Sequence, residues 1–131
     1  MPSADDLVEE ARRSIERVSA EHAFELTAAG ALLIDIRPAA QRAAHGGVPG
    51  ALIIERNVLE WRLDPTGEFR LPEVTDHARK LVVLCQQGYA SSLAAASLAA
   101  LGYTQPADVI GGFEAWARAG LPVLPHAQIS A

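Results

Sequence analysis

The 131-residue sequence contains one cysteine, Cys85, so no disulfide can form within the chain. A lone thiol without a disulfide framework is typical of a reducing compartment, and we expect a cytoplasmic protein. No apolar run approaches the roughly 18 residues that a membrane span requires. Residues 1–20 carry several acidic side chains and no apolar core segment, which argues against a secretion signal. We therefore expect no membrane association.

The sequence also lacks an excess of basic residues. Its 11 Lys and Arg are outnumbered by 16 Asp and Glu, which gives a net charge of −5, and no dense basic cluster occurs. This charge balance argues against nucleic acid as a partner. The cysteine and the four histidines lack the spacing of a metal site, so we expect no metal and no cofactor. We expect the four histidines at the surface: His22, His45, His77 and His126. The sequence leaves open whether the fold brings one of them next to Cys85 as a cysteine–histidine pair.

Short apolar runs alternate with helical segments along the chain. The runs predict strands at 15–19 (an edge strand), 31–37, 51–55, 81–85 and 107–110. Helices are predicted over 4–13, 20–30, 38–44, 57–63, 91–102 and 113–120, with a loop over 64–76. Ser19 and Asn57 are expected to cap two of these helices. This alternation predicts an α/β domain with a mostly parallel sheet of about five strands, flanked by helices on both faces.

The cysteine stands where the predicted strand 81–85 ends and the loop 86–90 begins. Reactive groups in parallel α/β sheets collect beyond the carboxyl ends of the strands. Gly88 permits a positive φ, so loop N–H groups can turn toward the sulfur as an anion-binding nest. The next helix is expected to begin near Ser91 or Ser92, and its free N–H groups also face the loop. These features favour the thiolate, which is the nucleophilic form.

A structural interpretation of Cys85 competes with the catalytic one. Free cysteine is among the most buried residue types and often only fills space at the end of a strand. The residues around Cys85 leave both interpretations open.

Four motifs follow one another along the chain: "LLIDIRP" at 32–38, "GGVPGALII" at 46–54, "LVVLCQQGYASS" at 81–92 and "LGYTQPADVIGGFEAWARAGLPV" at 101–123. In this order they resemble a single-domain rhodanese, the sulfurtransferase family, from about residue 17 to 124. The resemblance implies a three-layer α/β fold with a rhodanese domain over 17–131, preceded by an N-terminal helical extension over 1–16.

The resemblance also implies a chemistry for Cys85. The cysteine of this family accepts a sulfane sulfur from a donor such as thiosulfate and holds it as a persulfide. It then passes the sulfur to a thiophilic acceptor, which is cyanide, a thiol or a protein of a sulfur relay. Ser91 and Ser92 match the step from loop to helix, where a hydroxyl caps the helix or approaches the persulfide. The active-site loop implied by the resemblance is Gln86, Gln87, Gly88, Tyr89, Ala90 and Ser91.

The sequence departs from the family pattern at Ala90, where many relatives carry a basic residue, and at His45, which is displaced from the family's glycine–histidine position. Without a loop cation, arginines from elsewhere are expected to bind an oxyanion donor, because guanidinium suits oxyanions. The candidates are Arg56, Arg37 and Arg62.

Each arginine candidate has a structural alternative. Asp35 and Arg37 match a family pair near the active loop, and a buried ion pair is the favoured interpretation. Arg56 follows a strand and is otherwise a solvated surface residue. Trp61 and Arg62 are placed at one wall of the entrance, with simple packing favoured for Trp61.

Relatives within the same fold include phosphatases, which require an arginine six positions after the cysteine. Ser91 stands there, and no arginine occurs before Arg118, so phosphatase activity is disfavoured. Two further alternatives are a persulfide carrier with weak thiosulfate activity and a rhodanese-like binding module. Purely regulatory modules usually lack the cysteine, and its presence argues for chemistry.

Overall fold

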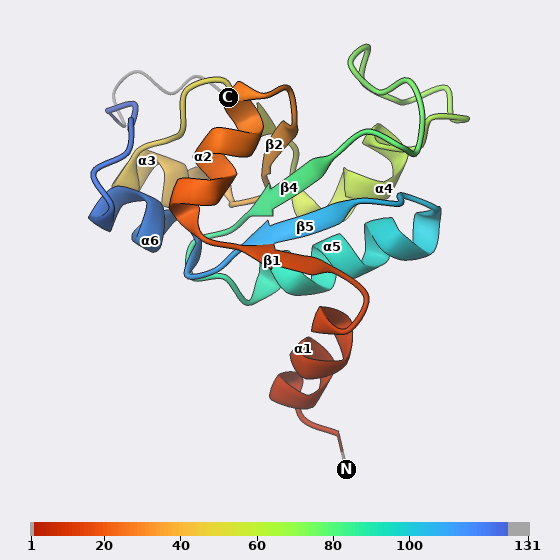
Figure 1. Cartoon of the computed structure of the whole chain (residues 1–131), viewed down its shortest axis with the longest axis horizontal. Coiled ribbons are helices and arrows are strands. Elements are labelled where there is room, and N and C mark those ends of the chain that lie inside the picture. The colour runs from red at the N-terminus through yellow and green to blue at the C-terminus, as the bar shows by residue number, and fades with distance from the viewer. Residues whose placement is uncertain (1, 126–131) are drawn as a thin grey trace.

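The computed structural model describes residues 2–125 and contains one sheet. The strand order is β1-β5-β4-β2-β3, and every neighbouring pair is parallel. The predicted α/β class with a five-stranded parallel sheet is therefore confirmed, and β1 is the predicted edge strand (Figure 1). The strands are β1 (Glu16–Val18), β2 (Leu32–Asp35), β3 (Leu52–Ile53), β4 (Leu81–Leu84) and β5 (Pro106–Val109).

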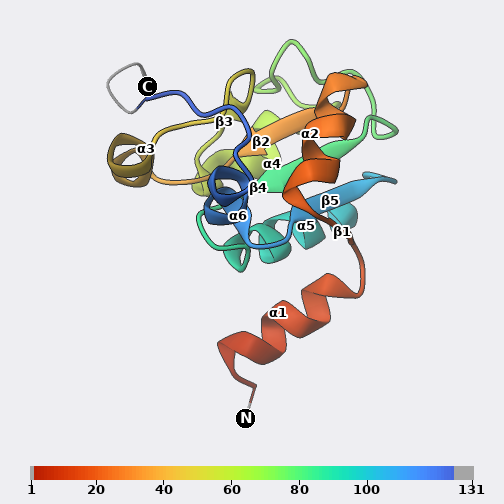
Figure 2. The ribbon, with the colours of Figure 1, turned by 60° about the vertical axis from the view of Figure 1, so that its left-hand side comes forward.

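Helices cover both faces of the sheet. The core on one face joins the strands to α4 and α5, and the core on the other face joins them to α2 and α6. The first helix, α1, lies outside these layers and packs against α5 (Figure 2). The helices are α1 (Ala4–Arg12), α2 (Ala20–Ala28), α3 (Ala39–His45), α4 (Leu59–Arg62) after a 3₁₀ turn η1 (Arg56–Val58), α5 (Ala90–Leu101) and α6 (Gly112–Arg118).

Strand β4 is the centre of the sheet, and all four of its side chains are fully buried. Leu81 and Val83 point toward α4 and α5, while Val82 and Leu84 point toward α2 and α6. A strand buried on both faces reads as a continuous apolar run, which is why the sequence predicts it so clearly. Its rigidity fixes the position of the next residue, Cys85.

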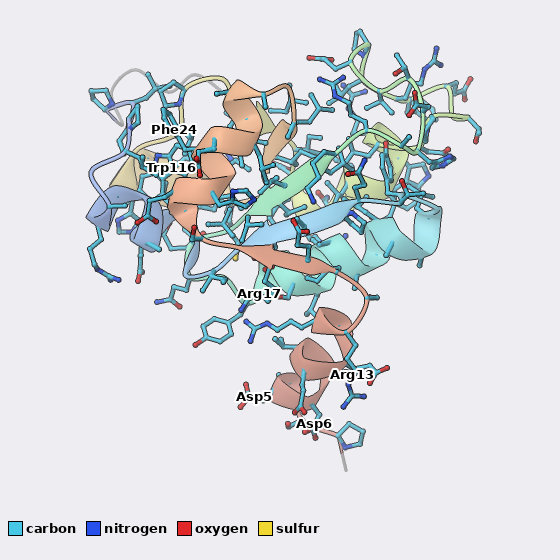
Figure 3. All side chains as sticks on the ribbon, in the orientation of Figure 1. Asp5, Asp6, Arg13, Arg17, Phe24 and Trp116 are labelled. Atoms are coloured by element: carbon cyan, nitrogen blue, oxygen red, sulfur yellow. The ribbon has the colours of Figure 1, made fainter. Side chains whose placement is uncertain are left out.

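The face formed by α2 and α6 is closed by two aromatic side chains. Trp116 is almost fully buried, and Phe24 contacts it edge to face with 5.8 Å between ring centroids (Figure 3). The aromatic residue of the last motif therefore anchors α6 on the sheet.

Helix α1 begins with a capping box, in which Ser3 accepts from the N–H of Asp6 and the Asp6 carboxylate accepts from the N–H of Ser3. Nine residues are too few for a helix that is stable by itself in water. Val8 and Ala11 are buried, and α1 packs on α5, so tertiary packing holds the helix in place.

Two predicted helix caps are wrong, although α5 begins within one residue of its predicted start. Asn57 caps nothing, because residues 56–58 form a 3₁₀ turn that precedes α4 and has no side-chain cap. Helix α5 begins at Ala90, one residue earlier than the range 91–102, and neither Ser91 nor Ser92 caps it. The cap at Ser19 is confirmed, since its hydroxyl accepts from the N–H of His22.

Residues 64–76 form the predicted loop without helix or strand. Within residues 2–125 no helix is long and apolar enough to cross a bilayer. In the same part of the chain, no three His, Cys, Asp or Glu side chains gather as a potential metal site. His22 and His45 are exposed, His77 is half-buried, and His126 lies outside the described residues.

Candidate active site

Cys85 lies directly after β4, at the carboxyl edge of the sheet. Its side chain is 6% exposed, yet it lines a pocket of about 620 Å³. The thiol is therefore neither sealed in the core nor free at the surface. The pocket is lined by Ile36, Arg37, Pro38, Ala39, Gln41, Glu55, Arg56, Asn57, Cys85, Gln86, Gln87, Tyr89 and Ala90.

Two backbone N–H groups donate to the sulfur. The N–H of Gly88 lies 3.1 Å from Sγ of Cys85, and the N–H of Ser91 lies 3.2 Å from it. Gly88 has φ +89°, which confirms the predicted positive φ in this loop. A side chain at this position would place Cβ 2.7 Å from the backbone nitrogen of Gly111. Glycine is thus required both for backbone conformation and for space.

The arrangement favours negative charge on the sulfur. Two N–H dipoles point at Sγ, and the sulfur lies beside the N-terminus of the 12-residue helix α5. Donors fixed in this way can stabilise an anion at the sulfur position.

Asp35 and Arg37 form a buried ion pair, as the favoured interpretation expects. The Arg37 guanidinium donates to the Asp35 carboxylate at 2.7 Å and to the carbonyl of Gly46 at 2.8 Å. It also donates to Oε1 of Gln86 at 3.0 Å and stacks over the Phe113 ring at 4.1 Å. Arg37 lines the pocket, but its guanidinium is engaged by the protein and fixes the first residue of the loop.

Arg56 lies at the pocket and is partly exposed. Its Nη1 contacts both oxygens of Glu60, at 3.1 and 3.0 Å. Partial burial raises the pKa of Glu60, but hydrogen bonds from Ser97 and from its own backbone, together with Arg56, lower that pKa overall. The carboxylate is therefore ionised at neutral pH and offsets part of the Arg56 charge.

The structure does not bring Arg62 and Trp61 to the pocket. Arg62 donates to the carbonyl of Phe69 in the loop 64–76 and does not line the pocket. Trp61 does not line the pocket and is 60% exposed. It therefore neither forms a wall of the entrance nor packs in the core. A four-residue helix turns both side chains away, a rotation that sequence position alone does not reveal.

The serine hydroxyls have a partner that the sequence analysis missed. Both Ser91 Oγ and Ser92 Oγ donate to Oδ2 of Asp108 at 2.8 Å. Asp108 is fully buried on β5 and pairs with Arg17, its register partner on β1. The sequence does carry a signal of this contact, which is an aspartate inside the apolar run "PADVI". A carboxylate buried on a strand requires hydrogen-bond donors or a cation as partners.

Two arginines at the site were also missed. Arg12 and Arg17 both donate to the carbonyl oxygen of Gly88, at 2.9 and 3.0 Å. Neither position carries a sequence signal of this contact, since arginines are ordinary in an amphipathic helix and on an edge strand.

The fold and the site together define a small α/β domain in which two loop N–H groups converge on the sulfur of one cysteine. The chain belongs to the rhodanese-like domain family, whose profile matches residues 19–119.

The chain is 30% identical over 110 residues to thiosulfate sulfurtransferase GlpE from Haemophilus influenzae, with 84% of this chain and 95% of that protein covered. It is also similar to the solution structure of the polysulfide-sulfur transferase homodimer from Wolinella succinogenes. That structure has a TM-score of 0.74 and 25% identity, with 95% of this chain and 88% of that chain covered.

A third similar protein, from Rhodopseudomonas palustris, is described as a protein of unknown function and possible tyrosine phosphatase. Its structure has a TM-score of 0.84 and 30% identity, with 94% of this chain and 95% of that chain covered. In the present chain Ser91 occupies the position where a phosphatase of this fold needs arginine, and its hydroxyl binds Asp108.

Proposed function

We propose that this protein is a sulfurtransferase that moves a sulfane sulfur from thiosulfate or a similar donor to a thiophilic acceptor through a Cys85 persulfide. The observation that carries the proposal is the Cys85 sulfur, which lines a pocket and accepts from the N–H groups of Gly88 and Ser91. The proposal places the protein in the cytoplasm, where a lone thiol stays reduced.

The reaction has two displacement steps. The Cys85 thiolate attacks the outer sulfur of thiosulfate, so an S–S bond forms to Sγ while the S–S bond of thiosulfate breaks and sulfite leaves with the electron pair. An acceptor, cyanide or a thiolate, then attacks the terminal sulfur of the persulfide. The bond from that sulfur to Sγ breaks, and the Cys85 thiolate returns.

The loop supplies stabilisation in both steps without moving. Sulfur carries negative charge before, during and after transfer, so donors fixed in advance need no reorganisation. The N–H groups of Gln86, Gln87, Tyr89 and Ala90 have no hydrogen-bond partner within residues 2–125. The proposal assigns them to the terminal sulfur of the persulfide.

A first test follows the sulfur by mass spectrometry. Incubation with thiosulfate is expected to add one sulfur atom to the protein at Cys85, and cyanide is expected to remove it with formation of thiocyanate. An unmodified Cys85 after incubation with thiosulfate, with 3-mercaptopyruvate and with a cysteine desulfurase would overturn the proposal.

Arg56 is the proposed binding cation for an anionic donor. Arg56→Ala is expected to raise the KM for thiosulfate about 3- to 10-fold with a smaller effect on kcat, the size expected of a partly exposed charge that only binds. Glu60→Gln is expected to lower the KM, because it removes the carboxylate that competes for Arg56. Steady-state thiocyanate formation measures both.

Arg62→Ala is the matched control, since Arg62 lies outside the pocket and should leave the KM unchanged. Equal KM values for the Arg56 and Arg62 variants would remove Arg56 from the binding site.

A persulfide carrier is the second candidate function, and Ala90 favours it. The loop offers amides but no cation, and the pocket's one partly exposed arginine is paired with Glu60. A carrier receives sulfur from a partner protein and does not need to bind thiosulfate well. A sulfur adduct that forms only in the presence of a cysteine desulfurase would favour the carrier.

A further inference from the structure

The carbonyl of Gly88 is held by two cations. Nη2 of Arg12 and Nη2 of Arg17 donate to this one oxygen. A carbonyl oxygen has two lone pairs, and hydrogen bonds from charged donors are roughly twice as strong as neutral ones. Gly88 is also the residue whose N–H donates to the Cys85 sulfur. The two arginines therefore fix the residue on which the sulfur depends.

Arg12 contacts three residues, two in the loop 86–90 and one in the first turn of α5. Besides Gly88, its Nε donates to Oγ of Ser92 at 3.0 Å, and its guanidinium lies 5.6 Å from the centre of the Tyr89 ring. Arg12 is the last residue of α1, which packs on α5 and has Val8 and Ala11 buried. The N-terminal helix thus delivers a guanidinium to the back of the loop.

Arg17 extends the same network to the second sulfur donor. It contacts Asp108 at 3.0 Å, and Asp108 accepts from the hydroxyl of Ser91. The N–H of Ser91 donates to the sulfur. Both N–H groups that contact the sulfur are therefore tied to the pair of arginines, one through Gly88 and one through Asp108.

The charged side chains that contact the loop 86–90 and the start of α5 from the α1 and β1 side leave a net positive charge. Arg12 and Arg17 bring two positive charges, and the buried Asp108 offsets one of them. The loop itself has Ala90 where a basic residue is common among relatives. Net positive charge behind the loop favours an anionic sulfur in front of it.

Both arginines lie before the segment 19–119 that matches the family profile. We infer that Arg12 and Arg17 are positioning residues of the sulfur site, which orient the Gly88 and Ser91 N–H groups and supply the cationic charge that the loop lacks. Helix α1 then contributes to the site through Arg12, its last residue. This inference rests on the proposed role of Cys85 as the reacting group.

The chain offers a matched control beside Arg12. Arg13 is exposed, and within residues 2–125 its ion pairs are with Glu9 and Glu10 of its own helix. Figure 3 shows Arg13 on α1 and Arg17 at β1. Replacing Arg12 or Arg13 by glutamine removes one positive charge from the same helix end, and only the Arg12 change touches the loop.

The experiment compares Arg12→Gln, Arg12→Lys and Arg13→Gln in the full chain. The first readout is the rate constant of Cys85 alkylation by iodoacetamide at neutral pH, and the second is kcat and KM for thiosulfate. Arg12→Gln is expected to slow alkylation and kcat about 3- to 10-fold while KM changes less than about 2-fold, because Arg17 still holds the carbonyl. Arg12→Lys should fall between Arg12→Gln and the wild type, and Arg13→Gln should match the wild type.

A merely structural Arg12 would lower the melting temperature and leave the rates of the folded protein unchanged, and that result overturns the inference. Equal losses in the Arg12→Gln and Arg13→Gln variants overturn it too. If Arg12→Gln does not fold, Arg12→Lys serves as the test. Lysine keeps the positive charge but loses one of the two hydrogen bonds that Arg12 makes to Gly88 and Ser92. Wild-type rates in Arg12→Lys would refute the inference. Alkylation needs no turnover, so a protein that fails to transfer sulfur still reports on this network.

Discussion

Cys85→Ser is expected to lower thiocyanate formation by more than about a thousand-fold while the protein stays folded. No other thiol exists in the chain, so no second residue can carry the sulfur. Serine differs from cysteine by one atom, and its smaller oxygen can accept from the same N–H groups of Gly88 and Ser91. The free energy of unfolding should therefore change by less than about 1 kcal/mol. Steady-state kinetics and thermal melting measure the two effects.

Alkylation of the wild-type protein by iodoacetamide provides the control, because it blocks the same sulfur without a mutation and should abolish activity in parallel with the modified fraction. Thiocyanate formation that survives in Cys85→Ser would show that the reaction does not pass through a cysteine persulfide.

Gly88→Val is expected to have the next largest effect, a loss of about 100-fold or more in kcat/KM. A side chain at φ +89° is strained, and its Cβ would lie 2.7 Å from the Gly111 nitrogen and 3.1 Å from the Val109 carbonyl oxygen. Both neighbours are backbone and cannot rotate away, so the loop must shift. A shift moves the N–H of residue 88 off the sulfur, and loss of one such donor costs roughly 10²- to 10³-fold in comparable anion sites.

Gly88→Ala tests the same point with the smallest possible side chain. Its control is Gly120→Ala, because Gly120 also has a positive φ of +76° but has no atom within 4 Å of an added Cβ. Both variants should lose about 1 kcal/mol from backbone strain. Gly88→Ala should lose further stability, because its Cβ also meets the Gly111 nitrogen, and only Gly88→Ala should lose activity. Wild-type kinetics in Gly88→Ala would show that the curl of the loop is not needed for the reaction.

The sequence predicts the part of the site that is local in the chain. The apolar run 81–84 identifies the central strand, and Cys85 follows it at the carboxyl edge. Gly88 indicates a loop with positive φ, which the structure has. The pairing of Asp35 with Arg37 is local as well, since the two residues are two positions apart, at the end of β2 and just after it.

Predictions that depend on the rotation of a short segment are less successful. Arg62 and Trp61 follow a 3₁₀ turn, and a turn of that kind changes which side chains face the pocket. The serines at the start of α5 have the composition of helix caps, but a buried carboxylate on β5 competes for their hydroxyls and binds both. Tertiary partners thus override local preference.

The sequence alone determined the α/β class, the parallel sheet and the position of the one thiol, because apolar runs, helix-forming segments and glycine at a tight loop are all written in neighbouring residues. Only the tertiary structure decided which charges serve that thiol. Arg12 lies 76 positions before Gly88, and Arg17 lies 91 positions before Asp108, yet both pairs are in contact. Such contacts form because packing α1 on α5 and β1 beside β5 brings distant segments together, and no local pattern encodes that docking.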